Sequence, residues 1–219
     1  PSLVNASGGL VDSVVNVVNP SIPFIASGSA RPTTGSRTLG GWNAFNFDGS
    51  ANFLTANGLA ALFTGSDKAM TVFVVCECDN VASAISQTQW ALGYSVTTNP
   101  IFYSYYLSNN NAVTRRDDAG LIITNNLGLV AGVNVNCTVF TGTTYSSYTN
   151  ATTNASGAAL DVGNLTLDRF AIGALVRSTN AQFFDGVIGE VIVFEGALST
   201  ADRLMVQRYL GNKYGAINP

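Results

Sequence analysis

The chain has 219 residues, of which 11% are charged and 47% hydrophobic, and its formal net charge is −3. This composition argues against intrinsic disorder and against long solvated helices, and the ten scattered Lys and Arg residues argue against a nucleic-acid-binding surface. The sequence contains no histidine, which excludes Ser-His-Asp and Cys-His nucleophiles and histidine metal sites.

Residues 1–41 place short apolar stretches among Gly, Ser, Pro and Asn, with little periodicity. We predict an extended N-terminal lead-in or arm here, ahead of a single domain over residues 42–219. Because this arm is apolar and cannot form a core alone, we expect it to dock onto a neighbouring protein. On that hypothesis, deleting residues 1–30 abolishes attachment and leaves the domain folded.

From Trp42 onward, short β-rich runs alternate with turn residues, a pattern typical of an antiparallel sandwich or barrel. In the run that begins at Met70, alternate side chains predict one inward face; they are Met70, Val72, Val74, Cys76 and Cys78. The run VIGEVIVF is apolar on both faces except at Glu190, which predicts a central strand.

The three cysteines are Cys76, Cys78 and Cys137. Buried free thiols are the favoured interpretation, and a disulfide from Cys137 to either of the others is the alternative. The longest apolar stretches are far shorter than the ~18 residues that span a bilayer, and no signal pattern opens the chain, so we expect no membrane span.

One helix is predicted, from about Ser199 to Gly211, with Ser199 as its N-cap and Gly211 or Gly215 at its end. We expect one arc of this helix to pack on the sandwich and the other to face solvent. The packing arc comprises Met205, Val206, Tyr209 and Leu210, and the solvent arc comprises Arg203, Gln207 and Arg208.

Three stretches resemble laminin-G-like domains, which are concanavalin-A-like jelly rolls. They are ARPTTGSRTLGGWNAFNFDGSANFLT, MTVFVVCE and FFDGVIGEVIVFEGALSTADRLMVQRYLGNKYG. The resemblance covers most of residues 30–215 and implies an all-β, two-sheet antiparallel jelly-roll sandwich with one C-terminal helix. Its particular form is similar to variants in tailed-phage structural proteins and in secreted bacterial proteins. It also implies that Glu190 is a structural glutamate, buried with a backbone or arginine partner.

The acidic residues could form two kinds of site, a glycosidase active site or a calcium site. Glycosidases of this fold carry three carboxylates at alternate positions of one strand, but here Glu77 and Asp79 have no third member, so we predict no enzymatic activity. The resemblance also implies a calcium ion at the sandwich rim, for which Asp48, Asp185 and Asp161 are candidate ligands. Ordinary turn formation by Asp48-Gly49 and Asp185-Gly186 is the favoured alternative, and no other cofactor is predicted.

Five tyrosines are the candidate binding residues. Three roles are open to them, namely core packing, a protein interface and stacking on sugars. The five tyrosines are Tyr103, Tyr105, Tyr106, Tyr145 and Tyr148. Residues 115–118, with the sequence RRDD, are interpreted as a solvated turn.

We therefore expect a non-enzymatic binding domain on a virion surface, as a phage head decoration, fibre or tail protein. Its expected partners are capsid or tail proteins and itself, with a trimer as the leading oligomer, and a cell-surface glycan as a further ligand. The alternative is an extracellular carbohydrate-binding module or adhesin domain of a secreted bacterial protein.

Overall fold

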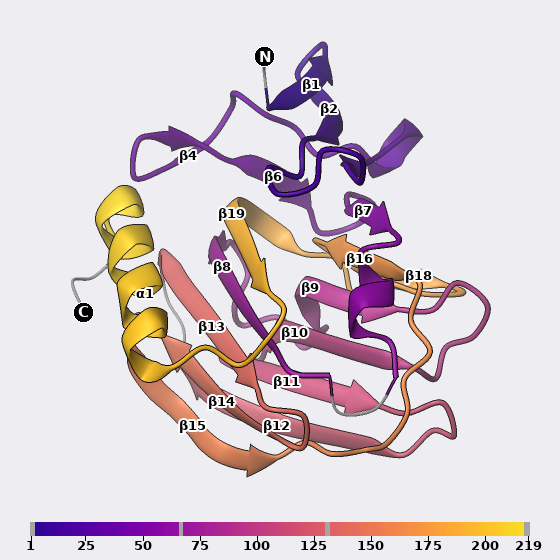
Figure 1. Cartoon of the computed structure of the whole chain (residues 1–219). Helices are drawn as coiled ribbons and strands as arrows, with labels where there is room; N and C mark the ends of the chain where they lie inside the picture. Colours follow the sequence, from indigo (N-terminus) through magenta and orange to yellow (C-terminus); the bar gives the residue numbers. More distant parts are fainter. Residues whose placement is uncertain (1–2, 66–67, 130–131, 217–219) are drawn as a thin grey trace.

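The computed structural model describes residues 3–65, 68–129 and 132–216, and for residues 126–129 it describes the backbone alone. Two antiparallel sheets lie face to face, with one helix outside them (Figure 1), so the predicted sandwich is confirmed. Among the described residues, no helix is long and apolar enough to cross a membrane.

Nine strands form the larger sheet. Their order across it is β1 (Val4–Ser7), β2 (Leu10–Val14), β3 (Phe24–Ile25), β7 (Leu54–Asn57), β16 (Arg169–Ile172), β9 (Gln87–Gly93), β10 (Ile101–Leu107), β11 (Asn110–Arg116) and β12 (Ile122–Leu129).

The smaller sheet has six strands, in the order β15 (Thr152–Ala159), β14 (Thr144–Thr149), β13 (Asn134–Phe140), β8 (Met70–Cys78), β19 (Asp185–Phe194) and β6 (Phe45–Asp48). Two short hairpins lie outside the sheets, β4 (Thr38–Leu39) with β5 (Trp42–Asn43), and β17 (Leu175–Val176) with β18 (Asn180–Ala181). The remaining elements are the 3-10 helices η1 (Gly28–Ala30) and η2 (Ala60–Phe63) and the α-helix α1 (Thr200–Tyr214).

Strand β8 shows how alternation builds two apolar layers. The predicted inward set from Met70 to Cys78 does face the core between the sheets, whereas Phe73 and Val75 face α1 on the other side. Strand β19 lies between β8 and β6, as predicted for a central strand. All three cysteines are buried free thiols, and burial raises the pKa of Cys76 to about 12.

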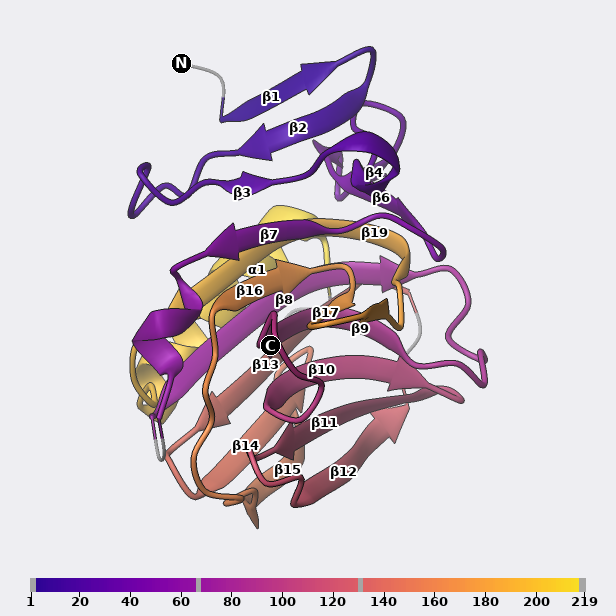
Figure 2. The same cartoon turned by 90° about the vertical axis from the view of Figure 1, so that its right-hand side faces the viewer.

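The N-terminal segment differs from the predicted arm. Strands β1, β2 and β3 pair in sequence and extend the nine-stranded sheet beyond β7 (Figure 2), and Val11 is fully buried in the central core. Residues 4–25 therefore belong to the sandwich itself. The weak periodicity of this segment did not indicate regular strands. Backbone pairing with β7 is what holds the segment in the sheet.

Helix α1 begins at the predicted cap and ends at Gly215, one of its two predicted ends, but its predicted faces are correct only in part. The Ser199 hydroxyl accepts a hydrogen bond from the Asp202 amide at 3.2 Å, and Gly215 ends the helix with a φ of 66°. Val206 and Leu210 pack on the sandwich as predicted. Met205 is 60% exposed, whereas Arg203 is buried. The guanidinium of Arg203 lies 3.6 Å from the Tyr148 ring centroid, so a cation-π contact holds the face that was predicted to be solvated.

The solvated turn predicted at residues 115–118 is also corrected. Strand β11 continues through Arg116, and alternation points Arg115 into the core, where it is 1% exposed. Its guanidinium lies over the Phe140 ring at 4.6 Å and donates to the Leu160 carbonyl at 3.3 Å. The turn follows at residues 117–120.

Candidate functional site

The five candidate tyrosines do not form one surface. Tyr106 and Tyr145 are buried in the central core, where the Tyr106 hydroxyl accepts a hydrogen bond from Asn136 at 2.6 Å. Tyr103 and Tyr105 point to the outer face of the nine-stranded sheet, with ring centroids 4.8 Å apart, and are 6% and 5% exposed. Tyr148 lies under Arg203. Core packing accounts for Tyr106 and Tyr145, and none of the five is an open stacking platform.

The predicted calcium ligands Asp48 and Asp185 are opposite each other on β6 and β19. The Asp48 carboxylate accepts hydrogen bonds from the Ser50 and Ala51 amides, both at 2.9 Å, as in a turn. Burial raises the pKa of Asp48, but the hydrogen bonds outweigh it and leave that pKa lowered. Burial, and next the charge of Asp79, raise the pKa of Asp185.

Asp161, the third candidate ligand, accepts a hydrogen bond from the Gly163 amide at 3.2 Å in a separate loop. Among the side chains that the structure describes, no three Asp, Glu or Cys residues group as metal ligands do. The contacts of Asp48 are those expected for ordinary turn formation, which was the alternative to calcium binding.

Other carboxylates are engaged in ion pairs. Glu190 accepts from Lys213 Nζ at 2.7 Å and from the Tyr214 hydroxyl at 3.0 Å, so its partners are these two side chains and not the arginine or backbone group implied by the resemblance. Asp79 accepts from Arg37 through both oxygens. Both carboxylates therefore already have a cationic partner.

A different cluster stands out at one end of the nine-stranded sheet, where two guanidinium groups share one acceptor. Arg177 Nη1 donates to the Thr98 carbonyl at 2.9 Å, and Arg116 Nη2 donates to the same oxygen. Arg116 Nε also donates to the Asn99 carbonyl at 2.7 Å. We call Arg116 and Arg177 the arginine pair.

The fold brings this pair together from distant parts of the chain. Arg116 is the last residue of β11 and points outward because Arg115 points inward. Arg177 follows β17, which packs on the outer side of the same sheet at Leu175. The loop between β9 and β10 supplies the carbonyl oxygens that hold both side chains.

The charges of the arginine pair are not balanced. Neither guanidinium takes part in an ion pair within the described ranges, and Arg177 Nε is buried without a hydrogen-bond partner there. Burial lowers the pKa of Arg177, and the positive charge of Arg116 lowers it further. A bound anion would relieve this repulsion, and a planar carboxylate suits guanidinium geometry.

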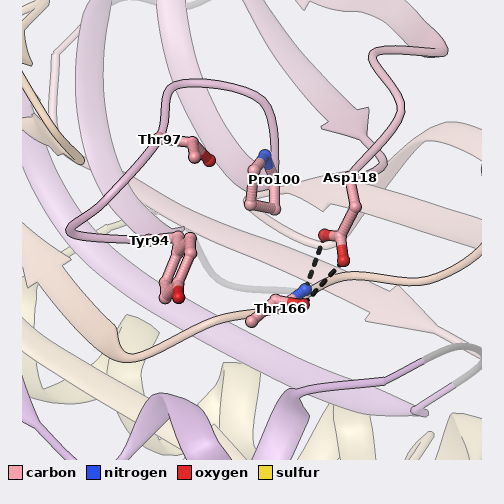
Figure 3. Close-up of a pocket in the computed structure, with 5 residues that line it drawn as sticks. All are labelled: Tyr94, Thr97, Pro100, Asp118 and Thr166. Carbon is pink, nitrogen blue, oxygen red and sulfur yellow. Dashed lines mark hydrogen bonds between the residues drawn. The ribbon is translucent and has the colours of Figure 1, made fainter.

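The same loop also lines a small pocket, which we call the loop pocket. Figure 3 shows its lining residues Tyr94, Thr97, Pro100, Asp118 and Thr166. The Asp118 carboxylate accepts from the Thr166 amide at 2.7 Å and from its hydroxyl at 2.6 Å, and Figure 3 shows it pointing toward Thr166. Asn99 links the two features by donating to the Asp118 carbonyl at 3.2 Å.

Together, the arginine pair and the loop pocket offer positive donors, hydroxyl groups, a carboxylate and a tyrosine ring within one loop region. Such a set fits a ligand that carries both an anionic group and hydroxyls. Arg116 and Asp118 belong to the RRDD stretch that was predicted as a solvated turn, and no sequence pattern pointed to Arg177. No local sequence motif could mark this pair of outward-pointing arginines, because one comes from β11 and the other from the β17–β18 hairpin.

No family model and no curated protein matches the chain. Solved structures do match. A Ruminococcus gnavus IT-sialidase CBM40 bound to α2,3-sialyllactose is 16% identical, with a TM-score of 0.56 over 75% of this chain and 92% of that one. The binding domain of Paraclostridial Mosquitocidal Protein 1 is 9% identical, with a TM-score of 0.69 over 93% of this chain and 53% of that one.

A third match is a botulinum neurotoxin type C structure, described as a toxin whose cell entry depends on interaction with two ganglioside molecules. It is 10% identical, with a TM-score of 0.61 over 92% of this chain and 51% of that one. The chain thus spans about half the length of the two toxin structures. At these identities the likeness shows the fold alone: this chain is a concanavalin-A-like jelly-roll sandwich with one C-terminal helix.

Proposed function

We propose that this chain is a non-catalytic glycan-binding domain that holds an acidic glycan at the arginine pair and the loop pocket. The observation that carries the proposal is the arginine pair, whose two positive charges share one carbonyl oxygen and have no acidic partner among the described residues. A carboxylate on a sugar would accept from both guanidiniums, and the sugar hydroxyls would meet Thr97 and Asp118.

The solved structures support this ligand class. The CBM40 structure is described as bound to sialyllactose, and the type C neurotoxin as dependent on gangliosides for cell entry. Sialyl groups carry a carboxylate and several hydroxyls, which is the chemistry offered by the arginine pair and the loop pocket. This proposal corresponds to the carbohydrate-binding alternative of the sequence analysis and not to its virion interpretation.

Calorimetric titration with 3′-sialyllactose, with lactose as the uncharged control, tests the proposal. We expect the wild-type chain to bind the sialylated sugar more tightly, and each of Arg116→Gln and Arg177→Gln to weaken that binding about tenfold or more, because a hydrogen bond to a charged group contributes roughly 1.5–3 kcal/mol. Arg208→Gln is the matched control, since Arg208 is exposed on α1.

Two results would contradict the proposal. One is equal binding of lactose and 3′-sialyllactose by the wild-type chain, and the other is wild-type affinity in the folded double variant of Arg116 and Arg177. The virion location, the extracellular alternative and the trimer remain predictions, and a glycan-binding role is compatible with either location because both face cell surfaces.

A further inference from the structure

A second surface with ligand-binding character lies on the opposite side of the sandwich. Trp42, Tyr209, Asn212 and Lys213 line a hollow between the β4–β5 hairpin and α1, which we call the aromatic hollow. Trp42 is 56% exposed and Tyr209 is 52% exposed, so two large rings face solvent at one place. Figure 1 shows α1 and β18, the hairpin strand near the arginine pair, on opposite sides of the molecule.

The hairpin holds Trp42 in a defined position. Leu39, at its start, is 1% exposed and packs in the cluster under α1. Gly40 has a φ of +54°, and a Cβ atom there would lie 2.4 Å from the Tyr214 carbonyl carbon, so the hairpin backbone rests directly on the end of the helix. The wall carrying Trp42 is therefore fixed before any ligand arrives.

Lys213 supplies a fixed donor at this site. Its ammonium donates to Glu190 at 2.7 Å and to the Tyr209 hydroxyl at 3.3 Å, and it lies 5.3 Å from the Trp42 ring centroid. An ammonium has three N–H groups, so one remains for a ligand. Glu190 balances the charge of Lys213, which makes the hollow close to neutral.

Asn212 adds the second polar group. It is exposed on α1, and its side-chain amide makes no hydrogen bond within the described part of the chain. An amide both donates and accepts, which suits a hydroxyl group. The hollow thus combines two apolar ring surfaces with a free amide and one free ammonium N–H.

We propose that the aromatic hollow is a second sugar-binding site, for an uncharged pyranose. The C–H face of a pyranose ring is apolar and would lie on Trp42 or Tyr209, while its hydroxyls would accept from Lys213 and pair with Asn212. An acidic sugar gains little here, because Glu190 already neutralises Lys213. The ligand class therefore differs from that of the arginine pair, and the inference stands independently of the proposed function.

Tryptophan fluorescence provides a local readout. The chain has two tryptophans, and Trp90 is 1% exposed in the core, so a sugar on the surface changes the emission of Trp42. Titration with cellobiose, maltose and gentiobiose should give a saturable change with at least one of them. Tyr209→Ala should weaken that sugar's binding about tenfold, as expected for the loss of one ring contact and a hydroxyl.

Two controls locate the effect. Trp42→Phe should abolish the fluorescence change, and Tyr94→Ala in the loop pocket should leave the affinity for the uncharged sugar unchanged. The inference is overturned if the folded wild-type chain shows no saturable change with any of the three sugars, or if Tyr209→Ala binds as the wild type does. An emission shift that follows protein concentration without sugar would overturn it too, by assigning the hollow to self-association. Sialyllactose binding through the arginine pair is unaffected by any of these outcomes.

Discussion

The two outer faces of the sandwich are covered in different ways. Helix α1 covers the six-stranded sheet, and its residues Leu210 and Tyr214 pack against Phe73 and Val75 of β8. The nine-stranded sheet has smaller apolar clusters, one where Leu175 of the β17–β18 hairpin meets Tyr103 and its neighbours and one where Val176 packs with Ala171. The outer face of the six-stranded sheet therefore forms an additional apolar layer with α1. The outer face of the nine-stranded sheet leaves polar side chains near solvent.

The charged side chains at the two candidate sites also differ in their partners. On the helix side, Lys213 and Glu190 form an ion pair whose side chains are 24% and 23% exposed. On the other side, Arg116 and Arg177 share a backbone acceptor and have no acidic partner among the residues that the structure describes. A paired charge stabilises the folded chain, whereas an adjacent unpaired charge costs free energy until an anion binds. The proposed function assigns the unpaired arginines to a ligand, whereas the Lys213–Glu190 pair belongs to the fold.

The largest expected loss of stability comes from disrupting the contact between the β4–β5 hairpin and the end of α1. Gly40→Ala places a methyl group against the Tyr214 backbone at a positive φ, and we expect it to lower the free energy of unfolding by about 2–4 kcal/mol. Gly41→Ala is the control, because Gly41 also has a positive φ but open space around its Cβ position. It should cost about 1 kcal/mol. Urea denaturation measures both, and equal losses would contradict the close contact.

A smaller effect is expected from the helix-side ion pair. Glu190→Gln keeps the shape of the side chain but removes the charge that Lys213 and Tyr214 contact, and it should cost about 1 kcal/mol. Burial lowers the pKa of Lys213, but the hydrogen bonds to Glu190 and Tyr209, together with the nearby charges, outweigh burial and leave that pKa raised. Sialyllactose binding should stay unchanged in this variant, and a selective loss of that binding would place Glu190 in the ligand site.

The smallest effect on stability is expected from the arginine pair. Arg177→Gln loses one hydrogen bond but also relieves repulsion by Arg116, so we expect the free energy of unfolding to change by no more than about 0.5 kcal/mol. The same denaturation assay measures it beside Glu190→Gln. A loss as large as that of Glu190→Gln would show that Arg177 serves the fold and would remove the contrast between the two faces.

Local sequence determined the elements of this protein that depend on short-range physics. Alternation along residues 70–78 predicted the inward face of β8, because successive side chains point to opposite faces of a strand, but it did not predict the second apolar layer under α1. Ser199 predicted the start of α1, and Gly215 was one of two glycines predicted to end it, because capping needs only neighbouring residues. The resemblance carried by the stretches around β6, β8 and β19 agrees with the observed sandwich.

Tertiary structure alone decided which side chains meet. The order of residues 4–25 comes from pairing with β7, and the burial of Arg203 on α1 comes from its contact with Tyr148. The arginine pair and the aromatic hollow each join side chains from distant segments. Periodicity predicts which way a side chain points from its own strand or helix, but not which other element lies there. That neighbour is set by the packing of the whole chain, and both candidate sites depend on it.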